Sequence, residues 1–246
     1  MAAADSTASL TRPRFNLAKK LLGEAPAAWG RYFNGFHTNP VEYDPSEAAL
    51  FDQLGLKLLP IAQQTPKVAG SALDGAAHAA VNVYKFISRL GVDHLAASGR
   101  EYLMFLDVEA QPSLSADYYL GWSKTLVSAS RDQSEGKFTI LPAVYARTGD
   151  AKTWSAIADA TTRGAEPCRG AWVARYHNDA CKKPRPDWET TFLTPSVALN
   201  CPILLWQFAI DCPDGNGVDC DLITPDAGAT STLLARLAVP AAPPPR

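Results

Sequence analysis

The chain has 246 residues, with 23 Lys and Arg against 25 Asp and Glu, so its formal net charge is −2. This length suits one large domain or two small ones. Hydrophobic residues make up 47% and charged residues 20%, which is typical of a globular protein and excludes wholesale disorder. Because the charge is balanced and no basic face is visible, we expect no nucleic-acid partner.

The sequence shows no run approaching the roughly 18 consecutive apolar residues that a membrane span needs, so we expect no span. The N-terminal segment has no apolar core behind a basic start, so we also expect no secretory signal peptide. A cytoplasmic location and export by a route that reads no such signal both remain open.

Apolar β-like runs alternate with amphipathic helical segments along the chain. In chain order we expect strands at residues 14–17, 30–36, 56–64, 101–109, 137–146, 170–177, 201–209 and 217–223. We expect helices at residues 44–55, 71–91, 113–130 and 150–163, and few after that point. Strand–helix alternation with apolar strands indicates a parallel sheet covered on both faces.

Eight strands favour a closed barrel over an open doubly wound sheet. The prediction is therefore an α/β fold, a TIM-type barrel in a single domain, with reduced helices around the last three strands. We expect a flexible N-terminus at residues 1–9, the barrel at residues 10–227 and a Pro/Ala-rich tail at residues 228–246. No GxGxxG or P-loop motif follows a strand, so we expect no nucleotide cofactor.

The run at residues 101–109 ends in the sequence Asp107-Val108-Glu109. Side chains alternate along a strand, so both carboxylates face the same side, with Cα atoms roughly 6.6 Å apart. Like charges this close raise the pKa of one partner, and a protonated carboxyl beside an ionised one can cleave a glycosidic bond. The alternative is that the two carboxylates only cap a helix or pair with an arginine.

Other strand ends contribute aromatic, polar and acidic side chains to the same end of the barrel. They are Tyr145, Trp172, Arg175, Tyr176, Trp206, Gln207, Asp219 and Asp221. Aromatic rings stack on the C–H faces of sugars while polar groups bind the hydroxyls, so this combination predicts a carbohydrate site. Each aromatic residue alone is more often part of a core.

The histidines have neither helical nor strand ligand spacing, so we expect no metal site. A disulfide between Cys212 and Cys220, across a short Gly- and Asp-rich loop, is one possibility for the cysteines. Free thiols are the other, and the partners of Cys168, Cys181 and Cys201 stay open.

The strings FLDVEA, PAVYA, AWVARY, LLWQFA and GVDCDL resemble the lysozyme-type glycoside hydrolases of family 25 and related bacterial glycoside-hydrolase-like domains, over about residues 10–225. The resemblance implies an N-acetylmuramidase that cleaves peptidoglycan. It implies that Glu109 is the general acid/base, that Asp107 supports the reacting sugar, and that Asp219 is the last-strand acid. The expected sugar contacts are Tyr145, Trp172, Arg175, Tyr176, Gln207 and Asp221.

The family's first strand normally carries an Asp that points into the site, whereas the stretch expected to form it here has Asn16. We expect Asn16 on the first strand and Arg31 on the second strand to contact substrate. An Asn cannot carry charge, which favours a non-catalytic carbohydrate-binding barrel, while the Asp107/Glu109 pair favours the muramidase. A third reading is an exported antibacterial effector domain with a cognate protein inhibitor.

Overall fold

The computed structural model describes residues 1–34, 41–63, 67–108, 111–177, 179–195, 197–198, 200–212 and 217–241. Within these residues, eight strands close into a barrel in which each strand pairs with its neighbours in chain order. The strands are β1 (Ala2–Asp5), β2 (Ala28–Tyr32), β3 (Lys57–Gln63), β4 (Glu101–Val108), β5 (Thr139–Arg147), β6 (Ala171–Ala174), β7 (Ile203–Cys212) and β8 (Val218–Ile223). The predicted TIM-type barrel is therefore confirmed.

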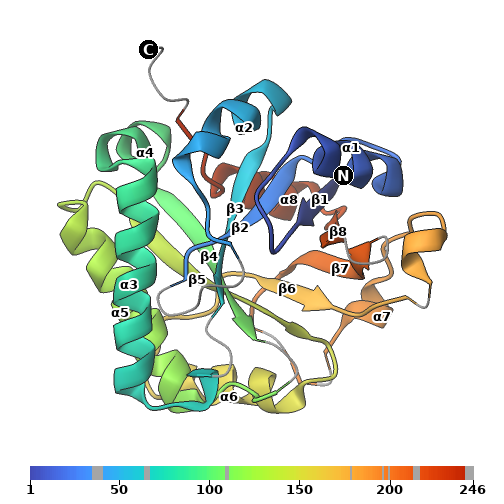
Figure 1. Cartoon of the computed structure of the whole chain (residues 1–246). Coiled ribbons are helices and arrows are strands. Elements are labelled where there is room, and N and C mark those ends of the chain that lie inside the picture. Colours follow the sequence, from blue (N-terminus) through green and yellow to red (C-terminus); the bar gives the residue numbers. More distant parts are fainter. Residues whose placement is uncertain are drawn as a thin grey trace.

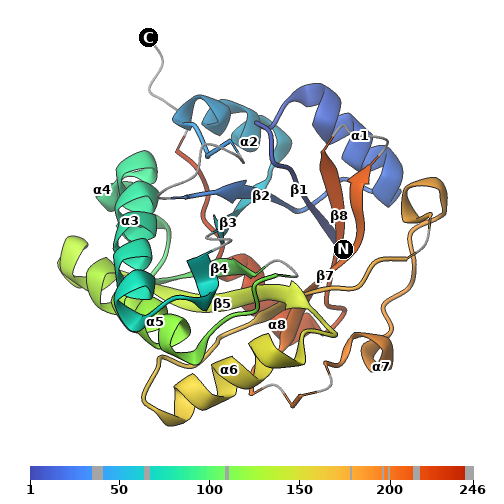
Figure 2. The same ribbon diagram turned by 60° about the horizontal axis from the view of Figure 1, so that its bottom comes forward.

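Helices surround the barrel (Figure 2). The α-helices are α1 (Arg12–Leu22), α2 (Ala48–Leu54), α3 (Ala72–Leu90), α4 (Val92–Ser98), α5 (Ala116–Gln133), α6 (Ala151–Thr162), α7 (Thr190–Leu193) and α8 (Ala227–Ala235). Short 3-10 helices span Pro45–Glu47, Lys67–Ala69 and Ala180–Lys182. The longest helices follow the early strands, and between β6 and β8 the described chain forms only one 3-10 turn and the four-residue α7, as the sequence predicts.

β8 departs from the all-parallel sheet that the sequence predicts. It runs antiparallel to both of its neighbours, β7 and β1, while the other strand pairs are parallel. Only residues 213–217 separate Cys212 from Val218. A connection this short can join antiparallel strands but cannot make the crossover that parallel strands need.

The first strand is Ala2–Asp5, so two predictions at the N-terminus are wrong. Residues 1–9 are not simply a flexible end, because all four residues of β1 are buried between β2 and β8. Residues 14–17 lie inside helix α1. Thr11 caps this helix by accepting a hydrogen bond from Arg14 N, and Pro13 occupies its first turn, so the local sequence favours a helix start.

The expected tail also contains ordered structure. Asp226 caps α8 by accepting a hydrogen bond from Ala229 N, and Leu233 and Leu237 are buried among the side chains inside the barrel. The backbone continues to Ala238, whose carbonyl accepts a hydrogen bond from Leu58 N near the start of β3. This segment therefore covers the amino-terminal end of the barrel, opposite the ends of the strands where the site lies.

Two hydrophobic layers position the strands. Inside the barrel, Leu59, Ile61 and Phe105 pack together with other inward-facing residues, while the outward-facing residues pack under the helices. The helices α3 and α5 lie side by side (Figure 1). A Cβ at Gly75 would lie 2.2 Å from the Tyr118 carbonyl oxygen, so the close approach of α3 to α5 requires glycine there.

The disulfide joins Cys181 to Cys212, not Cys212 to Cys220 as we considered. It links the 3-10 turn after β6 to the end of β7, so it ties down the irregular segment that connects these strands. Cys220 is a buried free thiol on β8, and the Sγ atoms of Cys168 and Cys201, also free thiols, lie 3.5 Å apart.

Candidate active site

The carboxyl ends of the parallel strands surround a cavity of about 280 Å³. Its walls combine acidic, amide, aromatic and aliphatic side chains from most strands of the barrel. The lining residues are Asp5, Thr7, Tyr32, Ile61, Gln63, Asp107, Tyr145, Trp172, Gln207, Ile210, Asp211, Gly217 and Asp219. The predicted Asp107, Tyr145, Trp172, Gln207 and Asp219 are thus brought together at one site.

Asp5 is an acidic residue at the end of the first strand, where the sequence analysis had expected Asn16. It is the last residue of β1 and pairs in register with Gly30 of β2 and with Asp219 of β8. A Cβ at position 30 would lie 2.4 Å from Cβ of Asp5, so the absence of a side chain at Gly30 provides the space that Asp5 occupies. Asn16, which we expected at this place, is instead an exposed residue of α1 and does not line the cavity.

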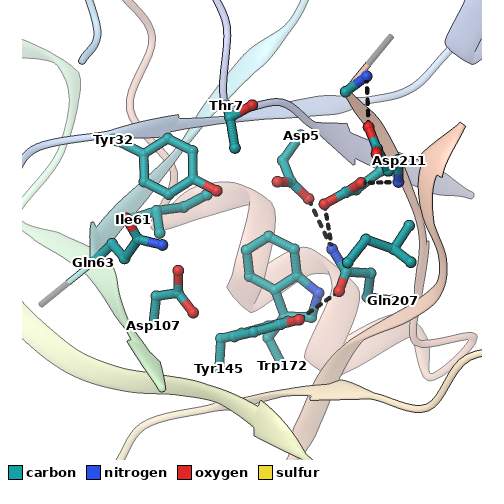
Figure 3. Close-up of a pocket in the computed structure, with 13 residues that line it drawn as sticks. Asp5, Thr7, Tyr32, Ile61, Gln63, Asp107, Tyr145, Trp172, Gln207 and Asp211 are labelled. Atoms are coloured by element: carbon teal, nitrogen blue, oxygen red, sulfur yellow. Dashed lines mark hydrogen bonds between the residues drawn. The ribbon is translucent and has the colours of Figure 1, made fainter. Parts of the chain in front are cut away.

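Gln207 holds Asp5 and Asp219 together at the cavity wall. Its Nε2 donates to Asp219 Oδ2 at 3.0 Å and to Asp5 Oδ2 at 3.4 Å, so a single amide group serves two acidic side chains (Figure 3). The other oxygen of Asp219 accepts a hydrogen bond from the Asp211 backbone N at 2.6 Å. Asp211 in turn accepts one from the Gly217 backbone N, which joins the two ends of the connection between β7 and β8.

A chain of hydrogen bonds fixes the orientation of this amide. The Tyr145 hydroxyl donates to Gln207 Oε1 at 2.5 Å and lies 3.1 Å from the Tyr176 hydroxyl. Because the Tyr145 proton points at Gln207, Tyr176 is the donor in the contact between the two hydroxyls. Burial raises the pKa of Tyr145 well above its ordinary value, with Tyr176 and Asp107 adding to the shift, so this hydroxyl keeps its proton.

The buried carboxyl groups of β1 and β8 repel one another. The pKa of Asp5 is raised well above its ordinary value, first by burial and then by the charges of Asp219, Asp221 and Asp107. The pKa of Asp221 is raised for the same reasons, burial first and Asp219 second. At least part of this cluster therefore holds protons at pH values where an exposed aspartate is fully ionised.

Asp221 lies one layer below the cavity and does not line it. It is fully buried opposite Ala3 of β1, and its Oδ1 accepts a hydrogen bond from Trp172 Nε1 at 2.9 Å. Asp221 is therefore better described as a residue that orients Trp172 than as the sugar contact we predicted. The Trp172 ring packs edge-on against Tyr145 and Phe105.

Asp107, near the end of β4, lies across the cavity from this cluster. Figure 3 shows Asp107 on one side and Asp5 and Gln207 on the other, with the Trp172 ring between them. Asp107 is 4% exposed and pairs in register with Gln63 of β3 and Tyr145 of β5. Glu109, the predicted general acid/base, lies outside the described residues, directly after β4.

Arg31 and Arg175 do not line the cavity. Arg31 points to the outer side of β2, since Ala28 and Tyr32 of the same strand face inward and side chains alternate. It is completely buried in an ion pair with Glu47 at 3.0 Å, so its role is structural and the prediction of a substrate contact is wrong. Arg175 lies next to Tyr176 in a neighbouring groove, with its guanidinium 3.6 Å from the centre of the Phe192 ring.

Several cavity residues were missed by the sequence analysis: Asp5, Thr7, Tyr32, Ile61, Gln63, Ile210, Asp211 and Gly217. Asp5 follows only the short run Ala2–Ala4, whereas Asp107 follows a longer apolar run, so the pattern before Asp5 was too short to indicate a strand. Gln63 ends a strand that was predicted. The aromatic Tyr32 ends β2 and faces inward with Ala28.

Two further observations concern other classes of function. Among the described residues, no cluster of three or more His, Cys, Asp or Glu side chains is arranged to hold a metal ion. Within the same part of the chain, no helix combines the length and the apolar character needed to cross a membrane.

No protein-family model and no curated protein matches the sequence. Solved structures do match it. An uncharacterised protein of B. stearothermophilus is 21% identical with a TM-score of 0.71, and the match covers 97% of this chain and 100% of that one.

The catalytic domain of an endolysin and a muramidase match over almost the whole chain. The catalytic domain of endolysin ply40, from bacteriophage P40 of Listeria monocytogenes, is 16% identical with a TM-score of 0.53, over 96% of this chain and 98% of that one. A muramidase from Acremonium alcalophilum is 17% identical with a TM-score of 0.50, over 96% and 99%. At these identities the similarity establishes the fold, and it confirms the predicted resemblance to lysozyme-type glycoside hydrolases at that level.

Proposed function

We propose that this protein is a glycoside hydrolase that cleaves the glycan strands of peptidoglycan, as an N-acetylmuramidase does. The observation that carries the proposal is the convergence of Asp5, Asp107 and Asp219 on one cavity with the Trp172 and Tyr145 rings. Carboxyl groups next to aromatic rings are the combination that binds a sugar and cleaves its glycosidic bond. The cavity sits at the end of the barrel where enzymes of this architecture place their catalytic residues.

The position of Asp5 strengthens the catalytic hypothesis over the non-catalytic one. The main argument for an inactive barrel was that Asn16 was expected where the first strand of the family carries an aspartate. Because the first strand is Ala2–Asp5, that place belongs to an aspartate. With Asp5, the set of acids that the family resemblance implies is complete in this sequence.

In the proposed reaction, Glu109 donates its proton to the glycosidic oxygen as the bond from that oxygen to the sugar C1 breaks. Asp107 orients the acetamido group of the sugar, whose oxygen forms a bond to C1 and replaces the leaving group. Water then attacks C1, reopens this bond and gives a proton back to Glu109. A carboxyl that exchanges a proton beside one that stays ionised is the general requirement of such chemistry.

Asp5, Gln207 and Asp219 have a supporting role in this proposal. The amide of Gln207 donates to both carboxyl groups, so the two side chains stay fixed although they repel one another. Both side chains line the cavity, so they lie where the hydroxyl groups of a bound sugar would contact them. The Tyr145–Tyr176 pair keeps Gln207 in the orientation that this requires.

The test is the release of reducing ends from purified peptidoglycan. We expect wild-type protein to release them and Glu109→Gln and Asp107→Asn each to lower the rate by at least about a hundredfold, since general acid–base catalysis contributes about 10²–10⁴. Asp132→Asn, which removes an exposed carboxyl on α5, is the matched control and should have the wild-type rate.

Thermal unfolding of each variant separates a lost catalytic group from a lost fold. Saturable glycan binding by the wild type without any released reducing ends would support the non-catalytic carbohydrate-binding barrel instead. Full activity of Glu109→Gln would contradict the assigned general acid/base.

A further inference from the structure

A second groove, of about 810 Å³, lies near the start of α6 and beside the acidic cavity. Its walls come from the segments that follow β4, β5 and β6, so it opens at the same end of the barrel. It differs from the cavity in charge, because its lining includes the three cationic side chains Arg147, Lys152 and Arg175.

The cations of this groove are available to a ligand. Arg147 and Lys152 are exposed, and neither forms an ion pair with any residue that the structure describes. The guanidinium of Arg147 lies 5.7 Å from the centre of the Tyr176 ring, which leaves its N–H groups free to bind an anion. Arg175 is held against the Phe192 ring at 3.6 Å.

Asp150 is the acidic residue among those that line the groove, and its carboxylate is already engaged. Its Oδ2 accepts a hydrogen bond from Thr153 Oγ1 at 2.6 Å, and its Oδ1 accepts one from Ser113 Oγ at 3.0 Å. Asp150 also caps α6 by accepting a hydrogen bond from Thr153 N. It therefore does not neutralise Arg147 and Lys152 by direct pairing, and the groove presents a surplus of positive charge.

The groove and the cavity meet at one pair of side chains. Tyr145 lines the cavity, Tyr176 lines the groove, and their hydroxyl oxygens are 3.1 Å apart. On β5, Arg147 comes two residues after Tyr145. A cationic side chain is therefore close along the strand to a residue that lines the acidic cavity. A glycan bound at the cavity can therefore extend into the groove without leaving the protein surface.

We infer that the groove binds carboxylate groups attached to the glycan that the acidic cavity cleaves. The inference rests on the proposed function and makes its substrate more specific. Neutral glycans offer no partner for Arg147 and Lys152, whereas the glycan strands of peptidoglycan carry carboxylates. These belong to the stem peptide or, where the peptide has been removed, to the lactyl group of muramic acid. Arginine binds a carboxylate in a bidentate manner and lysine as a point charge.

Binding of soluble fragments tests the inference without requiring turnover. The probes are a disaccharide–peptide, the same disaccharide with a free lactyl carboxylate, and a neutral N-acetylglucosamine oligomer, titrated calorimetrically at low and high salt. We expect at least one acidic fragment to bind about tenfold more tightly than the neutral one at low salt, with a smaller difference at high salt. Comparison of the two acidic fragments identifies which carboxylate the groove binds.

The variant Arg147→Gln/Lys152→Gln removes both free cations and keeps their approximate size. We expect it to bind the acidic fragment about tenfold more weakly and the neutral oligomer as the wild type does. Lys19→Gln/Lys20→Gln, which removes two exposed cations from α1, is the matched control and should bind both fragments normally. Equal affinity of the wild type for acidic and neutral fragments, or unchanged binding by the groove variant, would overturn the inference.

Kinetics separate this inference from the proposed function. If the protein cleaves peptidoglycan, the groove variant should raise KM and leave kcat unchanged, because the groove lies away from the reacting bond. If the wild type releases no reducing ends but prefers acidic fragments, the proposed catalysis fails and the carboxylate groove stands. If it cleaves neutral and acidic glycans equally well, the catalysis stands and the groove fails.

Discussion

Asp5 is 2% exposed and lies in register with Asp219 of β8, and Asp221 lies one layer deeper on β8. Burial and these neighbouring charges raise its pKa well above the ordinary value of 3.8. The folded state therefore binds a proton at Asp5 more tightly than the unfolded state does. Through linkage, stability falls as the pH rises from about the ordinary pKa towards the raised one. The buried carboxyl group of Asp5 therefore destabilises the fold at neutral pH.

Replacement of Asp5 by asparagine should change stability and activity in opposite directions. Asn keeps the size and can still accept a hydrogen bond from Gln207, but it carries no charge. We expect Asp5→Asn to raise the free energy of unfolding at pH 7 by about 1–2 kcal/mol and to reduce the dependence of stability on pH. We also expect it to lower the rate of peptidoglycan cleavage. Denaturant unfolding between pH 4 and pH 8 and the reducing-end assay measure both effects.

The control for this prediction is Asp132→Asn, whose carboxyl is exposed, and its stability should stay within about 0.5 kcal/mol of the wild type. A loss of stability in Asp5→Asn at pH 7 would show that the carboxylate is stabilised by its hydrogen bonds rather than strained by its neighbours.

At the scale of single residues, the prediction that the ends of the barrel strands form one site brought together Asp107, Tyr145, Trp172, Gln207 and Asp219, which all line the cavity. The same prediction missed Asp5 because only three alanines precede it, and alanine has little preference for strands. Their small side chains nevertheless fit between β2 and β8. Such a fit depends on the neighbours of a residue in space, which local sequence patterns do not contain.

At the scale of elements, the segment between β6 and β7 has little regular structure and is tied to the barrel by the disulfide Cys181–Cys212. The two cysteines are 31 residues apart in the sequence. Spacing alone favoured the nearer pair Cys212 and Cys220. Because β7 and β8 are antiparallel, Cys220 lies opposite Ala209 with its side chain buried, and Cys212 is left to pair across the segment.

Loss of this disulfide should destabilise the protein. We expect Cys181→Ser/Cys212→Ser to lower the free energy of unfolding by about 2–4 kcal/mol, since the bond closes a loop of this length in the unfolded chain. Reduction of the wild type should lower its melting temperature to about that of the double variant. An unchanged melting temperature on reduction would contradict the assigned bond.

The double variant is also the control for the remaining thiols. The Sγ atoms of Cys168 and Cys201 are 3.5 Å apart and are free in the structure. If these two thiols stay reduced, a reducing agent should have no effect on the double variant. A further drop in its melting temperature would show that Cys168 and Cys201 had become linked.

At the scale of the whole molecule, the two ends of the barrel have different roles. The carboxyl ends of the parallel strands hold the acidic cavity and the cationic groove, while α8 and the residues after it cover the opposite end. The barrel class follows from strand–helix alternation, and this alternation can be predicted from the sequence pattern. The closure of the far end could not be predicted, because the Ala- and Pro-rich composition of residues 228–246 resembles that of a loose tail. Its buried residues, which include Leu233, Leu237 and Ala238, become visible only in the fold.

Because α8 covers the end of the barrel opposite the cavity, we expect it to contribute to stability and not to catalysis. Leu233 is completely buried against the side chains inside the barrel, so Leu233→Ala should lower the free energy of unfolding by about 2–4 kcal/mol. Leu73→Ala is the matched control, because Leu73 is 83% exposed and its loss should cost less than about 0.5 kcal/mol. Well below the melting temperature, both variants should keep the wild-type kcat/KM for peptidoglycan. A fall in kcat/KM for Leu233→Ala alone would show that packing at the covered end determines the geometry of the carboxyl groups at the other, since the inward-facing residues form one continuous cluster along the barrel axis.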